Sequence, residues 1–197
     1  MKKNIYSVLK SLAVILLATT AVSCKKDKQD VATPVNPNET ELITTVRLVC
    51  TPTSGSNTQA NTFSFRDIDG DGGKPPVIDT IRLDANQSYS VNVIVLDETK
   101  NPVDTTTNEI EKEKDIHEFF YTKIGTYDLT TTYLDFDDHN VPVGLKMRFD
   151  VGNGFTVKTN ALKVTLKHQP GLKPTSGMGD ISVGETDVEV QFPILVQ

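Results

Sequence analysis

The chain has 197 residues, of which 37% are hydrophobic and 7% aromatic, and its 26 acidic and 20 basic side chains give a net charge of −6 at pH 7. Nucleic acid is excluded as an expected partner, because affinity for phosphate backbones comes from clustered Lys and Arg, and here these residues are dispersed among acids. The two cysteines are too few for a disulfide framework, and the absence of Trp argues against an aromatic platform for sugars or bases.

The first 23 residues have the layout of a secretory signal peptide. Lys2 and Lys3 form a cationic start, residues 12–18 form a short apolar run, and small residues precede Cys24. The run is shorter than the ~20 residues that a membrane-spanning helix needs. Small residues followed by cysteine resemble a bacterial lipobox, in which the thiol of Cys24 is diacylated and becomes the mature N-terminus. We therefore expect a lipid-anchored protein; the alternative is a secreted protein with a free cysteine.

The remaining chain divides into a tether and one domain. Residues 24–39 are rich in Lys, Asp, Gln, Thr, Pro and Asn and predict a flexible tether, whereas residues 40–197 have the size of a single domain. The signal carries three lysines and no acid, so the mature chain has a net charge of about −9. Cys50 continues an apolar alternation with Val46 and Leu48, which predicts a buried, inert thiol.

From residue 40 onward, apolar and polar residues alternate with a period of two, which is typical of half-buried strands. In one segment Met147, Phe149 and Val151 alternate with charged residues. Pro193 has no N–H for a ladder bond and predicts a sheet edge near that point. The nine expected strands are 42–51, 62–67, 77–84, 88–97, 116–123, 127–136, 144–151, 160–167 and 186–196. Their short spacing predicts an all-β fold, an antiparallel immunoglobulin-like β-sandwich of about seven to nine strands.

One segment departs from the strand pattern. Thr106 and Glu109 have the spacing of a capping box, and the good helix formers that follow predict a short helix over residues 107–114. In the alternative, the segment is extended and its acidic residues, with His117, project from one face as a stripe of negative charge.

The sharpest local motif is Asp67-Ile68-Asp69-Gly70-Asp71-Gly72-Gly73. Carboxylates at alternate positions followed by glycine resemble the first half of a calcium-binding loop, in which several hard oxygens surround one cation. Position twelve is Ile78, where such a loop needs a bidentate Glu. Asp67, Asp69 and Asp71 therefore predict either a Ca²⁺ site completed from elsewhere in the fold or a turn that uses Asp and Gly for its geometry.

A second acidic loop spans residues 135–140, with the same spacing of Asp135 and Asp137 but without the glycines. If the two loops meet at one end of the sandwich, they could share a cation. The favoured interpretation is a solvated acidic turn.

Two histidines suggest a different metal. His117 follows Glu113 and Asp115, and His168 ends an alternating apolar run. Zn²⁺ takes imidazole nitrogen together with carboxylate oxygen, so His117, His168 and Glu113, or Asp115 in its place, are a candidate three-ligand site. The alternative is that each histidine is hydrogen-bonded at the end of a core strand. No serine, cysteine or lysine lies in an activating context, so we expect a protein that is not an enzyme.

Several segments resemble a group of short Bacteroidota lipoproteins catalogued as "type 1 periplasmic binding fold superfamily protein". The matching segments, which cover most of the mature chain in order, are Ile43-Thr44-Thr45, DIDGDGGKPPV (67–77), NEIEKEKDIHEFFY (108–121), DFDDHNVPVGL (135–145), VTLKHQP (164–170) and VGETDVEVQFP (183–193). Members are similar to proteins encoded near TonB-dependent outer-membrane receptors. The catalogue name implies two Rossmann-like lobes, but this chain is too short for them and has no βα alternation.

The resemblance implies an accessory lipoprotein of an uptake system. We therefore expect a non-enzymatic binding module, lipid-anchored to the outer membrane, on its periplasmic face or at the cell surface, with a TonB-dependent receptor as a partner. The alternatives are a lipoprotein that binds or buffers a divalent cation and, with least support, a hydrolase.

Overall fold

The structure is a computed structural model of the chain, and it describes residues 42–55, 58–70, 72–154 and 159–197. The predicted signal peptide and tether, the predicted lipid-attachment residue Cys24 and the candidate ligand Asp71 lie outside the described residues. The described part contains no helix that is long and apolar enough to cross a membrane.

The described residues form ten strands and one short helix. The elements, in chain order, are β1 (Thr45–Pro52), β2 (Asn61–Arg66), β3 (Val77–Ile78), β4 (Ile81–Leu83), β5 (Ser88–Leu96), α1 (Thr107–Lys112), β6 (His117–Ile124), β7 (Leu129–Tyr133), β8 (Lys146–Val151), β9 (Ala161–His168) and β10 (Glu185–Val196).

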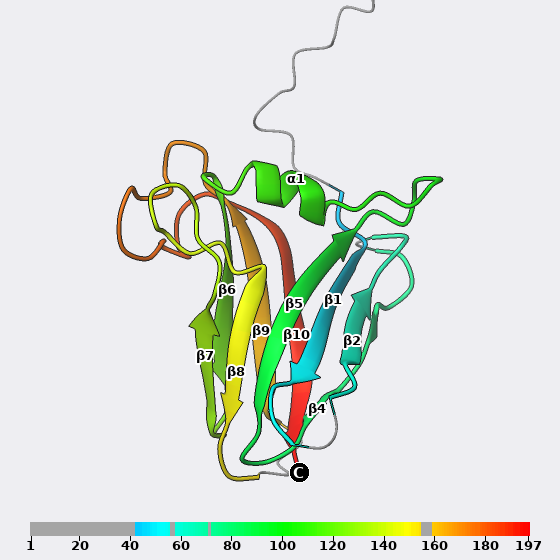
Figure 1. Cartoon of the computed structure of the whole chain (residues 1–197). Helices are drawn as coiled ribbons and strands as arrows, with labels where there is room; N and C mark the ends of the chain where they lie inside the picture. The colour runs from blue at the N-terminus through cyan, green and yellow to red at the C-terminus, as the bar shows by residue number, and fades with distance from the viewer. Residues whose placement is uncertain (1–41, 56–57, 71, 155–158) are drawn as a thin grey trace, which may run out of the picture. The chain divides into compact units, whose positions relative to one another are not determined.

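The strands form two sheets packed as a sandwich (Figure 1). One sheet has the order β3-β2-β1-β5-β8-β7 and the other has the order β4-β10-β9-β6. All pairs are antiparallel except β4 and β10, which run parallel. The predicted all-β sandwich is therefore confirmed, with one parallel pair in an otherwise antiparallel arrangement.

The alternation read from the sequence sets the core. Met147, Phe149 and Val151 of β8 are buried, whereas Lys146 and Arg148 on the other face are exposed. Such burial contributes about 1.5–3 kcal/mol for each large apolar side chain, which is the main favourable term in folding. Cys50 is fully buried, and this burial raises the pKa of its thiol to about 12, as expected for an inert thiol.

Residues 77–84 form two strands, so the prediction of one strand there is wrong. The chain crosses from one sheet to the other at Asp79 and Thr80, because β3 pairs with β2 whereas β4 pairs with β10. Asp79 fixes the crossing point: its N–H donates to the Ser64 carbonyl at 2.9 Å, and its carboxylate accepts from the Ser64 N–H at 2.8 Å.

Strand β10 lies between β9 and β4, but β4 pairs only with Ile194–Val196. From Glu185 to Pro193, β10 pairs with β9 alone among the described strands. The Ile194 N–H donates to the Asn160 carbonyl on the β9 side, so by alternation the nitrogen of Pro193 points to the other side. The edge predicted at Pro193 therefore exists on one side of β10.

The predicted helix is present as α1, and the extended alternative for this segment is wrong. The predicted capping box is also wrong: within the described chain, the Thr106 side chain makes no cap hydrogen bond. Thr107 binds the segment to β5 instead, because its hydroxyl accepts from the Val95 N–H at 2.7 Å. Ile110 is fully buried in the core, and α1 lies across one end of the sandwich, which we call the α1 end (Figure 1).

Candidate functional site

The structure brings together the three residues of the predicted histidine site. His117 begins β6 and His168 ends β9, and the two are direct cross-strand partners. Their rings stack with centroids 4.7 Å apart and an interplanar angle of 14°. Glu113 is the C-cap residue of α1, and its Oε2 lies 4.0 Å from Nδ1 of His117. One ligand atom from each of Glu113, His117 and His168 lies within 4.8 Å of the other two.

A fourth group, Asp187, was missed by the sequence analysis. It lies where the β9–β10 register shifts between Thr186 and Val188, and its side chain is only 2% exposed. Its Oδ2 is 3.7 Å from Nε2 of His117, and its buried Oδ1 has no hydrogen-bond partner among the described residues. No local signal marked it, since the sequence gives one acid among several in a strand and a bulge is set by tertiary pairing.

The hydrogen bond of His117 fixes which of its nitrogens carries the proton. Nδ1 lies 3.1 Å from the carbonyl oxygen of Glu113, which can only accept, so Nδ1 is the donor. Burial lowers the pKa of His117 to about 4, so the ring is neutral at pH 7 and Nε2 presents a lone pair. Burial also raises the pKa of Asp187 to about 6. Two acceptors therefore face each other near neutral pH.

A buried ion pair lies beside this cluster. Nζ of Lys173 is 3.0 Å from Oδ2 of Asp137, with both side chains 1% exposed, and it also donates to the carbonyls of Lys114 and His117 at 2.6 and 2.9 Å. On the opposite face of β6, the carboxylate of Glu118 is fully buried, and this burial raises its pKa to about 7. The start of β6 is thus surrounded by desolvated charges.

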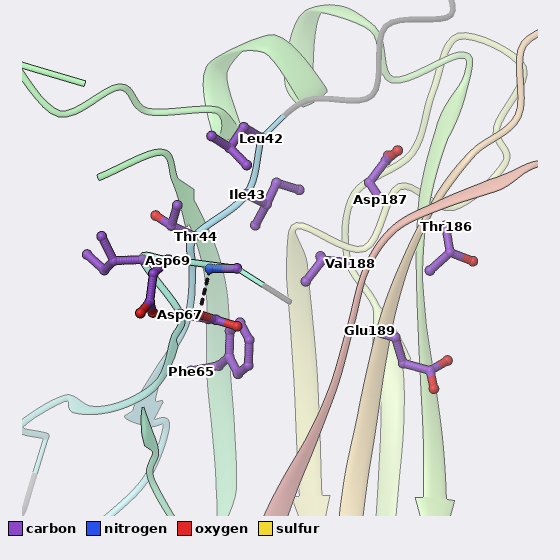
Figure 2. Close-up of a pocket in the computed structure, with 12 residues that line it drawn as sticks. Leu42, Ile43, Thr44, Phe65, Asp67, Asp69, Thr186, Asp187, Val188 and Glu189 are labelled. Carbon is purple, nitrogen blue, oxygen red and sulfur yellow. Dashed lines mark hydrogen bonds between the residues drawn. The ribbon is translucent and has the colours of Figure 1, made fainter. Parts of the chain in front are cut away.

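The Asp67–Gly73 segment forms a turn in which the described carboxylates bind backbone. Oδ1 of Asp67 accepts from the Gly70 N–H at 3.0 Å (Figure 2), and Oδ2 of Asp69 accepts from the Lys74 N–H at 3.0 Å. These bonds are those of Asp in turn geometry. The Ca²⁺ site stays a prediction, because Asp71 lies outside the described residues.

The second acidic loop is also bound to its own backbone. The Asp135 carboxylate accepts from the N–H groups of Gly144, Leu145 and Lys146 at 2.9–3.1 Å. Asp137, with Asp115 and His139, forms a second cluster of metal-ligand type, but the Lys173 ammonium already neutralises Asp137. Strands β1, β5 and β8 separate β2 from β7 by roughly 19 Å at about 4.8 Å per strand, so the two acidic loops start from distant strands, and a cation shared between them stays a prediction.

A groove of about 480 Å³, which we call the acidic groove, opens beside the unpaired edge of β10 (Figure 2). Its apolar part includes Ile43, Phe65 and Val188, and its acidic side chains are Asp67, Asp69, Asp187 and Glu189. The residues that line it in the described structure include no Lys, Arg or His. Its volume falls within the ~300–1,000 Å³ common for ligand sites.

Comparison of the chain with protein-family models, with curated proteins and with solved structures found no match. The fold and the site geometry therefore carry the functional argument.

Proposed function

We propose that the chain is an exported lipoprotein, anchored to the outer membrane through Cys24, whose β-sandwich is a non-enzymatic binding module for a protein partner of a TonB-dependent uptake system. The signal-like N-terminus, the cysteine and the polar tether support the anchoring. The resemblance to lipoproteins encoded near such receptors supports the kind of partner. The single observation that supports binding is the acidic groove beside the unpaired edge of β10.

The groove favours an extended, basic segment as its occupant. Glu189 and Gln191 point their backbone N–H and C=O groups away from β9, because the even-numbered residues of β10 carry the hydrogen bonds to β9, as the bond from the Ile194 N–H to the Asn160 carbonyl shows. A free strand edge of this kind accepts an added strand through main-chain hydrogen bonds, while adjacent pockets select side chains. Glu189 is already paired with Nζ of Lys163 at 3.2 Å, and the Asp187 side chain is 2% exposed. Asp67 and Asp69 remain in contact with solvent in a groove lining that has no basic residue, and they favour Lys or Arg in that segment.

Binding is tested with a labelled peptide of alternating Lys and Val, and with a matched peptide in which Glu replaces Lys. The full chain in detergent should bind the Lys peptide more tightly than the Glu peptide, and added salt should weaken this binding. Asp67→Asn combined with Asp69→Asn should weaken it, whereas Asp128→Asn, which neutralises an exposed acid at the opposite end of the sandwich, should not. Equal affinity for the two peptides would contradict the proposal that the acidic groove selects a basic segment.

The strand edge is tested separately with Gln191→Pro. Its N–H points to the free edge, so proline there should keep the β9 ladder and block strand addition, as Pro193 already does two residues on. Gln191→Ala is the control, and circular dichroism reports whether the fold is kept. Peptide binding that survives Gln191→Pro would show that no strand is added at this edge.

Anchoring and partner are tested in cells. Cys24→Ser should leave the protein either unprocessed or released, and a variant that stays membrane-bound after a salt wash would contradict lipidation. A photo-crosslinking residue at position 191 should capture an outer-membrane receptor. If no receptor adduct forms while peptide binding holds, the chain is a binding module outside receptor uptake.

A further inference from the structure

The exposed apolar side chains of the described chain all lie at one end of the sandwich. Nine large hydrophobic side chains are exposed, and each lies in or next to a segment that enters the domain or connects strands at the α1 end. They come from residue 42, from residues 77–78 and from the β5–α1, β7–β8 and β9–β10 connections. At the opposite end, the described residues include no exposed large hydrophobic side chain. Exposed apolar residues on a soluble surface are normally scattered singly, so this clustering calls for an apolar partner.

Two of these connections are folded with their charged groups inward and their apolar groups outward. Nζ of Lys173 and Oδ2 of Asp137 are 3.0 Å apart, and both side chains are 1% exposed. The residues just before them in the sequence, Leu172 and Phe136, are 57% and 43% exposed. The usual arrangement is the reverse, because Lys and Asp are rarely buried. The ion pair therefore joins two loops that present apolar side chains to their surroundings.

The β9–β10 connection is also held in place by a buried amide. Nε2 of Gln169 donates to the carbonyls of Asp180 and Val183 at 2.7 and 3.1 Å, and Gln169 is fully buried. Met178 and Ile181, in the same connection, are 57% and 40% exposed. The loop thus holds these two side chains outward on a backbone that is bonded to the core of the domain.

We infer that the α1 end docks on the surface of a lipid bilayer, with the side chains of an apolar rim inserted among the lipid headgroups. The apolar rim consists of Leu42, Val103, Phe136, Leu172, Met178 and Ile181. The inference rests on the proposed anchoring through Cys24. It adds an orientation of the domain, which a lipid anchor at the end of a tether does not set by itself.

The length of the predicted tether favours contact through this end. The described chain begins at Leu42, just before β1 at the α1 end (Figure 1), 18 positions after Cys24. A flexible chain of this length spans roughly 25 Å on average and about 60 Å when fully extended. The nine residues of β5 place the opposite end of the sandwich about 30 Å away. Contact through the opposite end would therefore stretch the tether beyond its average span, whereas contact through the α1 end would not.

The charges of the α1 end select the kind of lipid. Glu109 and Glu111 of α1 are exposed, and so is Asp180 beside the apolar rim. Anionic headgroups repel carboxylates that come within about 10 Å, the screening length at moderate salt. The partner surface is therefore a zwitterionic bilayer, to which apolar contact and not charge supplies the attraction.

A protein is the competing partner for the apolar rim. The rim is spread over four separate segments of the chain around the α1 end, and such side chains can all reach one continuous apolar medium. Leu42 also lines the acidic groove, so docking through this end places the groove beside the bilayer. A basic segment of a membrane receptor would meet the groove there.

The test measures the depth of single positions in the bilayer. The full chain, lipidated at Cys24, is reconstituted in phosphatidylcholine vesicles with a fluorophore on Met178→Cys or, at the opposite end, on Thr126→Cys. Cys50 is buried and does not take the label. We expect nitroxides on the lipid acyl chains to quench the fluorophore at position 178, and aqueous iodide to quench the fluorophore at position 126.

Substitutions in the apolar rim separate insertion from proximity to the bilayer. Leu172→Ser combined with Ile181→Ser should abolish acyl-chain quenching at position 178, while the protein still floats with the vesicles. The control, Thr175→Ser combined with Ser176→Thr, changes the same loop without removing an apolar side chain and should leave the quenching unchanged. The comparison of positions 178 and 126 does not use the double variant, so it decides the question if that variant does not fold.

The inference alone is overturned if the chain floats with the vesicles but iodide, and not the acyl-chain nitroxides, quenches the fluorophore at position 178. It is also overturned if acyl-chain quenching appears only when phosphatidylglycerol replaces phosphatidylcholine, because the attraction would then not be apolar. A chain that does not float with the vesicles would overturn the anchoring and the docking together. A failure of the Lys peptide to bind would contradict the function proposed for the groove alone.

Discussion

Two carboxylate-rich regions lie at the α1 end, and they differ in what the carboxylates bind. In the Asp67–Gly73 turn, the motif closest to a known metal loop, Asp67 and Asp69 each accept a backbone N–H and remain in contact with solvent. In the histidine cluster, Asp187 is buried beside a second acceptor and one of its oxygens is unpaired. The comparison teaches that the density of acids in a sequence does not tell which carboxylates are satisfied by backbone N–H groups and which are buried without a partner.

The largest effect should come from the ion pair that supports the histidine region. Lys173→Met removes a buried ammonium and leaves Asp137 unpaired, so the free energy of unfolding should fall by about 3–5 kcal/mol. Urea denaturation measures it. The double variant Lys173→Met with Asp137→Asn should lose less than the sum of the two single variants, and strict additivity would show that the pair is not coupled.

A pH effect should arise from Glu118. Burial raises its pKa in the folded state to about 7, above its ordinary value near 4.5, so its contribution to stability is fully present below pH 4.5 and is lost as the pH rises to 7. The loss is on the order of 3 kcal/mol at most. Glu118→Gln should match the wild type in stability at pH 4 and exceed it at pH 7, measured in EDTA. Parallel pH profiles would show that Glu118 is solvated.

Substitution of Asp187 and substitution of Asp67 should change the free energy of unfolding in opposite directions. At pH 7, Asp187→Asn should raise the free energy of unfolding by about 1–2 kcal/mol, because a neutral amide replaces a buried carboxylate whose Oδ1 has no hydrogen-bond partner among the described residues. Asp67→Ala should lower it by about 1 kcal/mol, because the Gly70 N–H loses its acceptor. A destabilised Asp187→Asn variant would mean that Asp187 is a structural residue.

The smallest effect should be that of Ca²⁺ on the Asp67–Gly73 turn. Because Asp67 and Asp69 already accept backbone N–H groups, millimolar Ca²⁺ should shift the wild-type Tm no more than that of the Asp69→Asn, Asp71→Asn double variant. A wild-type rise that the double variant loses would break the comparison and place a calcium site in this turn.

The strands and the core were predictable because the signal is local. Alternation along β8 marked its buried face directly, and residues 107–114 read as helix from their composition. The crossing between sheets at Asp79 could not be predicted, because residues 77–84 have the pattern of one extended segment. The segment is divided into β3 and β4 only because its two halves pair with strands of different sheets. The cap at Thr106 failed because Thr107 bonds to β5 instead, a tertiary contact that spacing within the helix cannot show.

The candidate site was predictable in part. Glu113 and His117 are four residues apart, and His168 ends a run whose alternation places it on the inner face, so these three could be grouped from the sequence. Asp187 could not, because it comes from a bulge 70 positions after His117 and its neighbours in sequence are other acids and threonines. The burial of Lys173 and its ion pair with Asp137 could not be predicted either, because a lysine in a loop is normally exposed.

The central position of β10 has a consequence for how the chain folds. The strand nearest the C-terminus completes the four-stranded sheet between β9 and β4, and it also supplies Asp187 and one wall of the acidic groove. Folding is slow when contacts join distant parts of a sequence, and here β4 must wait for a strand more than a hundred residues later. The four-stranded sheet is therefore complete only after β10 has been made, which makes the last residues of this strand a poor place for truncation.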